Sequence, residues 1–173
     1  DLIATAQRLE THHPDAVLSP DAERGLRHYL DGPLRTQLTE AGDGDKSFAF
    51  LFSHTPKPYQ QMTKIDGWNR SVPVYNTGGW VNEQPVTQHT QGAQAIVVDD
   101  ELNVMAVEFY RQQPGGGAGA VRVREPLVDD PGHAALHAEL VERVQPTVGP
   151  WARFSAAAAH ELAHRRALLE TLY

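Results

Sequence analysis

The sequence predicts an α+β fold, a partial α-β-β-α layered sandwich in which a mixed sheet is flanked by helices. Helically spaced leucines come first, short apolar runs typical of strands follow, and two more helical segments end the chain. Because helices and strands are grouped rather than alternating, this order indicates α+β architecture or the end of a layered α/β fold. With 173 residues, 40% of them hydrophobic, the chain is long enough for one domain with a buried core.

The N-terminal third is expected to be helical. Residues 1–10 predict a short helix, and a second helix begins after Ser19, where a capping serine is followed by Pro20 and by acidic residues in the first turn. A leucine stripe then continues at helical spacing. We expect Gly32 and Pro33 to interrupt this stripe and to divide it into two short helices.

The middle of the chain predicts strands. The run 48–52 is apolar at every position, which is typical of a strand covered on both faces. The turn sequence DDEL separates two apolar segments and predicts a hairpin. The expected strands are 48–52, 72–75, 94–98, 103–109 and an edge strand at 120–124.

The C-terminal part predicts two helices, at about 132–144 and 151–172. We expect residues 1–112 to belong to a single domain, of which they form the C-terminal part. Residues 113–119 form a Gly-rich loop, and 120–173 supply the edge strand and the C-terminal helices, which pack on the same domain.

Composition excludes several classes of protein. A net charge of -7 argues against a broad nucleic-acid surface, and the absence of cysteine excludes disulfides and thiolate sites. No apolar stretch reaches the roughly 18 residues that a membrane-spanning helix needs. No signal peptide is visible, and a chain without cysteine suits a reducing compartment, so we expect a cytoplasmic protein with no membrane span.

The segment HELAH, residues 160–164, contains the H-E-x-x-H pattern of zinc peptidases. His160 and His164 share one helix face and Glu161 lies beside them, but the only downstream candidate for a third ligand is Glu170 on the same helix. A zinc peptidase is therefore a minor alternative, and an amphipathic helix packed on the body is the simpler interpretation. Its apolar stripe would comprise Phe154, Ala158, Leu162 and Leu169.

The other candidate motifs are weak. GGGAG at 115–119 lacks the Lys-Ser/Thr of a P-loop and is interpreted as a solvated linker. The remaining histidines show no ligand spacing with a third group, so we expect them to lie at the surface or to be partly packed. They are His12, His13, His28, His89, His133 and His137.

His54 lies in a more informative context. It follows the apolar run 48–52 directly, in the segment FLFSHTPKPY, where Pro56 and Pro58 stiffen the loop. A histidine at a strand end either caps the strand or points a ligand into a site. About twenty residues later a second strand runs into the segment VPVYNTGGWV.

Together these two segments resemble the C-terminal half of calcineurin-like metallophosphoesterases. In that family a buried strand ends in G-H-x-H, often followed by T-H-K-P and an aromatic residue, and a later strand runs into N-T-G. Residues 52–59 lie over the first block and residues 74–81 over the second. The hairpin AIVVDDELNVMAVEFY is similar to the closing strands, so the resemblance covers about residues 25–111.

The resemblance implies a hydrolase, a phosphatase or phosphodiesterase, with two divalent ions (Mn, Fe or Zn) about 3.5–4 Å apart that clamp a phosphate. Its substrate would be a small phosphoester or a phosphorylated molecule. The resemblance implies that His54 ligates one metal. Ser53, Lys57, Asn76 and Gly78 would contact phosphate or shape the loop. We expect Lys57 to be solvated, Asn76 to fix the loop by hydrogen bonds and Gly78 to permit a positive φ.

Two departures from the family pattern matter. Pro56 stands where the second metal-binding histidine would be, and Ser53 replaces the glycine before the first. The upstream motifs D-x-H, G-D-x-x-D and G-N-H-D/E are absent from the sequence. We therefore assign no catalytic residue and expect an incomplete or degenerate form, weakly active or inactive, or a C-terminal fragment of a longer enzyme. A non-catalytic binding or scaffold module is the alternative.

Overall fold

The structure, a computed structural model, describes residues 17–44, 46–53, 55, 57–79, 92–111 and 119–172. The helical elements are α2 (Pro20–Tyr29), the π-helical η1 (Leu30–Leu34), α3 (Arg35–Glu40), α4 (Pro131–Val144), the 3-10 turn η2 (Gln145–Thr147) and α5 (Val148–Leu172). The strands are β1 (Phe50–Phe52), β2 (Tyr59–Thr63), β3 (Val72–Asn76), β4 (Gly92–Val98), β5 (Val104–Arg111) and β6 (Arg122–Val123).

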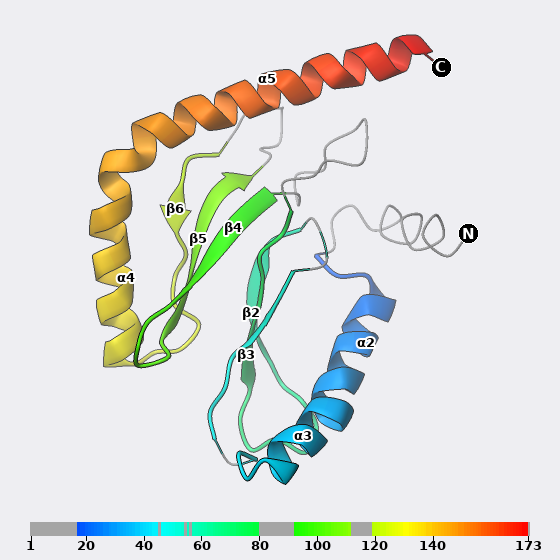
Figure 1. Cartoon of the computed structure of the whole chain (residues 1–173), viewed down its shortest axis with the longest axis vertical. Coiled ribbons are helices and arrows are strands. Elements are labelled where there is room, and N and C mark those ends of the chain that lie inside the picture. Colours follow the sequence, from blue (N-terminus) through cyan, green and yellow to red (C-terminus); the bar gives the residue numbers. More distant parts are fainter. Residues whose placement is uncertain are drawn as a thin grey trace.

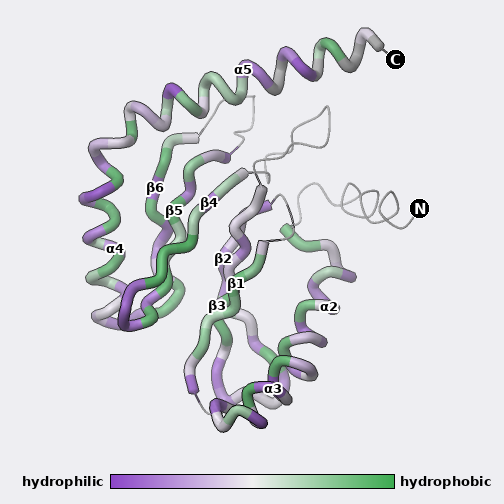
Figure 2. Tube along the Cα trace, in the orientation of Figure 1, coloured by the Kyte–Doolittle hydropathy of each residue, from purple (hydrophilic) through white to green (hydrophobic). Residues whose placement is uncertain are grey.

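Two small sheets lie between helices, so the fold is a mixed α+β arrangement (Figure 1). Sheet A has the order β1-β3-β2, and sheet B has the order β4-β5-β6. Helices α2 and α3 cover the outer side of sheet A, whereas α4 lies along sheet B (Figure 1). Hydrophilic and hydrophobic residues are interspersed along α4 and α5 (Figure 2).

The first helix begins where the sequence predicts. Ser19 caps α2 by accepting a hydrogen bond from the backbone N–H of Ala22 at 3.2 Å, and Pro20 occupies the first turn. We expected Gly32 and Pro33 to interrupt the helix, but the chain stays helical there and passes through a π-helical turn that contains Pro33. Proline lacks an N–H for the helical ladder, and a wider turn accommodates it without ending the helix.

Sheet A contains one strand that the sequence does not predict. Strand β1 runs parallel to β3, and β2 runs antiparallel to it, so β3 is the central strand. The expectation that β1 is covered on both faces is wrong, because Leu51 is 41% exposed. This strand is an edge strand with one neighbour, and its other side chains are only half-buried against α2.

Sheet B follows the predicted hairpin. Strands β4 and β5 pair antiparallel around a turn in which Leu102 has φ 65° and Asp99 accepts the backbone N–H groups of Glu101 and Asn103. Strand β6 pairs with β5 at the edge of the sheet, which confirms the predicted edge strand.

The two sheets pack face to face around Tyr75. Its ring lies in a core cluster with Val104 and Ala106, and its hydroxyl donates to the carbonyl of Val104 at 3.1 Å. On the opposite side of sheet A, Leu30 is fully buried among the side chains of β2 and β3. Sheet A therefore has an apolar contact on each face, one with α2 and η1 and one with sheet B.

Helices α4 and α5 both contact sheet B. Asp130 caps α4, and hydrogen bonds from the backbone and ring of His133 hold the pKa of its carboxyl below the usual value. In α5, Trp151 packs on Phe109 with ring centroids 4.6 Å apart. The expected stripe is wrong at Phe154, which is 45% exposed.

Several predictions fall on residues that the structure does not describe. The helix expected at 1–10 and most of the Gly-rich loop at 113–119 lie outside the described residues, as do the side chains of Leu162 and Leu169. Among the residues that are described, no helix is both long and apolar enough to cross a membrane.

Tyr75→Phe is expected to lower the free energy of unfolding by about 1 kcal/mol at neutral pH, because the carbonyl of Val104 loses a buried donor. Burial raises the pKa of Tyr75 from 10.0 to about 12. The folded state therefore keeps its proton longer than the unfolded state, and this contribution is complete below about pH 10 and lost as the pH rises toward 12. Chemical denaturation between about pH 10 and 12 should show that the free energy of unfolding falls less in the variant than in the wild type.

Tyr29→Phe is the matched control, because it removes a hydroxyl from a residue that is 40% exposed. A control variant that changes stability and its alkaline dependence as much as Tyr75→Phe would refute the inter-sheet role.

Candidate functional site

The candidate site lies where the parallel strands β1 and β3 end together. Phe52 and Asn76 are register partners at this edge, and the segment that leaves β1 contains the predicted metal ligand His54. His54 and Pro56 lie outside the described residues, so the structure places the loop through its neighbours. The carboxyl ends of parallel strands are where loops gather functional side chains.

Asn76 holds this loop from the end of β3. Its side chain is completely buried, and its amide nitrogen donates to the carbonyl of Lys57 at 2.7 Å and to the hydroxyl of Thr55 at 2.6 Å. A longer contact of 3.3 Å reaches the carbonyl of Thr55. The amide oxygen is buried with no partner among the described residues. One neutral side chain thus fixes the backbone on both sides of position 56.

Gln94 extends this hydrogen-bond network into sheet B. Its buried amide nitrogen donates to the carbonyls of Asn76 at 2.8 Å and of Tyr59 at 3.1 Å. Thr77 adds a backbone hydrogen bond to the carbonyl of Phe52 at 3.2 Å. Sequence reasoning missed Gln94, although a glutamine inside the run GAQAIVV was a detectable signal, because buried polar groups need partners.

Gly78 permits the tight approach of the loop to sheet B. Its φ is 70°, and a Cβ atom here would lie 2.6 Å from the carbonyl oxygen of Gly92 and 2.7 Å from the ring of Pro58. Any side chain would therefore separate the loop from β4 as well as strain the backbone.

The expectation that Lys57 is solvated is wrong, because this residue is only 2% exposed. The hydrogen bond from Asn76 draws the Lys57 backbone against β3, which places this residue in the interior. Ser53, by contrast, is exposed. A lysine buried beside a fixed loop cannot be treated as a mobile surface charge.

The residues that the structure describes do not assemble a two-metal centre. Pro56 offers no donor atom at the position of the second histidine. Among the described residues, no group of three or more His, Asp or Glu side chains could hold a metal ion. The arrangement can position a histidine loop, and we derive no catalytic step through a metal.

The peptidase motif lies on the exposed part of α5. His160 and His164 are exposed, and Glu161 forms an ion pair with Arg165 at 2.9 Å. Hydrogen bonding to Arg165 holds the pKa of the Glu161 carboxyl below its usual value. The part of the chain that the structure describes provides no third ligand here, so the motif is consistent with a solvated helix face.

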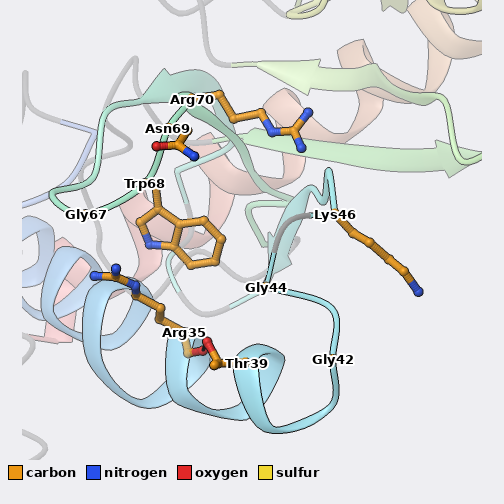
Figure 3. A pocket seen from close by; sticks show the side chains of 9 residues that line it. All are labelled: Arg35, Thr39, Gly42, Gly44, Lys46, Gly67, Trp68, Asn69 and Arg70. Carbon is orange, nitrogen blue, oxygen red and sulfur yellow. Dashed lines mark hydrogen bonds between the residues drawn. The ribbon is translucent and has the colours of Figure 1, made fainter.

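A polar pocket of about 570 Å³ lies at the opposite end of sheet A, between α3 and the loops before β1 and β3 (Figure 3). It is lined by Arg35, Thr39, Gly42, Gly44, Lys46, Gly67, Trp68, Asn69 and Arg70. Arg35 lies on one side of the Trp68 indole, whereas Lys46 extends away on the other (Figure 3). Since these cations diverge and pair with Asp31 and Asp43, the pocket contains no assembled reactive group.

Comparison of the chain with protein-family models, with curated proteins and with solved structures finds no match.

Gly78→Ala is expected to lower the free energy of unfolding by more than about 2 kcal/mol. A left-handed backbone conformation costs an alanine about 1–2 kcal/mol, and steric overlap with Gly92 and Pro58 adds to this cost. Gly25→Ala is the matched control. Gly25 lies in α2 with no atom within 4 Å of a built Cβ, so this change should stabilise by about 0.5–1 kcal/mol. Urea denaturation of both variants measures the difference, and similar effects would contradict the close approach.

Asn76→Asp is expected to destabilise the protein by about 3 kcal/mol at neutral pH, because a buried carboxylate would face the carbonyls of Thr55 and Lys57. The unfavourable charge raises the folded-state pKa of the introduced carboxyl, so the deficit should shrink as the pH falls. Denaturation at several pH values measures this, and a deficit that does not change with pH would argue against the loop-fixing role.

Proposed function

We propose that this chain is of the calcineurin-like metallophosphoesterase type and carries one histidine loop of a phosphoester hydrolase. In this proposal His54 is a metal ligand, and the chain does not complete a two-metal centre with its own residues. The mixed α+β arrangement with two small sheets and the parallel pairing of β1 with β3 are the features of the fold that support this proposal.

The observation that carries the proposal is the clamp formed by Asn76. The buried amide of Asn76 holds the connection between β1 and β2 at Thr55 and Lys57. Fixing the chain immediately on both sides of position 56 restricts the direction of the residues between β1 and β2. Such restriction is what a ligand-bearing loop requires, because metal affinity depends on ligands held in place by surrounding groups.

The residues of this chain then have defined roles. His54 would supply a neutral imidazole, Asn76 and Gln94 would orient the loop, and Gly78 would let the loop approach sheet B. None of them is assigned a proton transfer. Phosphoester hydrolysis belongs to a complete centre, to which this chain would contribute one ligand.

A non-catalytic binding or scaffold module is the second candidate, and Pro56 is the observation that favours it. Proline at the second ligand position keeps the loop stiff while removing its chemistry. The two candidates differ in the geometry they require of His54. A degenerate metal loop still aims that imidazole toward a partner ligand at position 56, whereas a scaffold has no such requirement.

Restoring the second histidine tests this geometry. Pro56→His is expected to bind Zn²⁺ or Mn²⁺ at least about tenfold more tightly than the wild type, because a second ligand would join His54 in a loop that is already fixed. Adding His54→Ala to this variant should return the affinity to the wild-type level. Calorimetric titration of the chelator-stripped protein measures both effects.

Ser53→His is the matched control, since it adds an imidazole to the same loop at an exposed position. If Pro56→His gains no more affinity than this control, the loop does not aim ligands, and the scaffold is the better description.

The unmodified chain is expected to hydrolyse an aryl phosphodiester with Mn²⁺ no faster than its His54→Ala variant does. A release assay for 4-nitrophenol from bis(4-nitrophenyl) phosphate measures both rates. Metal-dependent turnover that disappears in His54→Ala would show that the chain completes an active centre, contrary to this prediction.

A further inference from the structure

A cluster of arginines surrounds one buried carboxylate on sheet B. The side chain of Glu108 on β5 is 4% exposed, and its register partner on β6 is Arg122. Arg122 donates to Glu108 through Nε at 2.9 Å, Arg111 approaches at 3.2 Å and Arg124 at 3.4 Å. We call Arg111, Arg122 and Arg124 the arginine cluster.

The charges in this cluster do not balance. Three guanidinium groups meet a single carboxylate, so two positive charges remain in excess in a partly buried place. Among the described residues, no second carboxylate forms an ion pair with the cluster. Burial lowers the pKa of Arg124, and repulsion from Arg111 and Arg122 lowers it further, against the attraction of Glu108. Guanidiniums held together in this way favour an additional anion.

Donors remain available to such an anion. The terminal amino groups of Arg122 have no acceptor among the described residues, and its side chain is 55% exposed. Arg124 uses one terminal nitrogen for Glu108 and is also partly exposed. The cluster is therefore accessible to a ligand from solvent.

The arginine cluster also adjoins the loop that contains His54. Arg111 donates to the carbonyl of Pro58 at 3.3 Å, which joins the cluster to the end of that loop. Gln60 on β2 donates to the carbonyl of Glu125 just after β6 at 2.6 Å, which holds the edges of the two sheets together there. The excess charge thus lies beside the candidate site, in a protein whose net charge is -7.

We propose that the arginine cluster binds a phosphate group. A dianionic phosphate would balance both excess charges, whereas a carboxylate would balance only one. Its oxygens can accept paired N–H donors from more than one guanidinium, which suits arginines that arrive from β5, β6 and the segment after β6. This inference goes beyond the proposed function, because it requires no metal and no participation of His54.

Phosphate titration of the chelator-treated protein tests the proposal. At constant ionic strength, inorganic phosphate is expected to bind more tightly than chloride, as measured by calorimetry and by NMR shifts of arginine Nε–H signals. Arg122→Ala should weaken phosphate binding at least about tenfold, because it removes the guanidinium whose N–H donors are most exposed to solvent. Arg122→Lys should recover only part of the loss, since a lysine supplies charge without the fork.

Arg143→Ala is the matched control, because Arg143 is an exposed arginine on α4 that pairs with its helix neighbour Glu139 at 2.8 Å. It should leave phosphate affinity unchanged. Glu108→Gln, checked for folding by circular dichroism, should increase the affinity at least about threefold, because a competing negative charge is removed.

The outcomes are distinct. Equal affinities for inorganic phosphate and phenyl phosphate would support a site for phosphoester groups, and binding of inorganic phosphate alone would support a site for the free ion. Phosphate binding no stronger than that of chloride, or an equal loss in Arg143→Ala and Arg122→Ala, would overturn the proposal. Since no metal is present, these outcomes are independent of the test on Pro56→His.

Discussion

The interaction on which the candidate site depends is the buried amide of Asn76. Its nitrogen donates from the end of β3 to the hydroxyl of Thr55 and to the backbone carbonyl of Lys57 in the segment that leaves β1. The backbone carbonyl of Asn76 accepts a hydrogen bond from Gln94 of the other sheet. A buried amide that made fewer hydrogen bonds would be costly, so the geometry of the network is strongly determined. The loop, the end of sheet A and the beginning of sheet B therefore form one hydrogen-bonded unit.

The amide network is neutral, whereas the arginine cluster beside it is positively charged. The amides of Asn76 and Gln94 position backbone without bringing a net charge to the strand ends. The arginine cluster next to them concentrates positive charge around Glu108 and contacts the loop through Pro58. If both proposals hold, the loop would offer a ligand for metal and the cluster would offer donors for phosphate. The two would then be complementary parts of one phosphoester-binding surface.

Prediction from sequence succeeded where the causes of structure are local. The cap at Ser19 and the turn after Asp99 use hydrogen bonds within four residues, so the chain contains the whole signal. Strand β2 was missed because two glutamines stand in its centre and only Tyr59 and Thr63 are buried. Its conformation follows from pairing with β3, which no local pattern expresses. Lys57 was misjudged for the same reason, since its burial depends on Asn76.

The sequence by itself determined the mixed helix and strand content, the helix start, the hairpin, the edge strand and the segments that resemble the metallophosphoesterase motifs. Only the tertiary structure decided that Asn76 and Gln94 would share one network and that three arginines would surround Glu108. Caps, turns and hydrophobic periodicity act over a few residues and can be read along the chain. The convergence of side chains depends on strand register and sheet packing, which join residues far apart in sequence and are fixed only when the whole core forms.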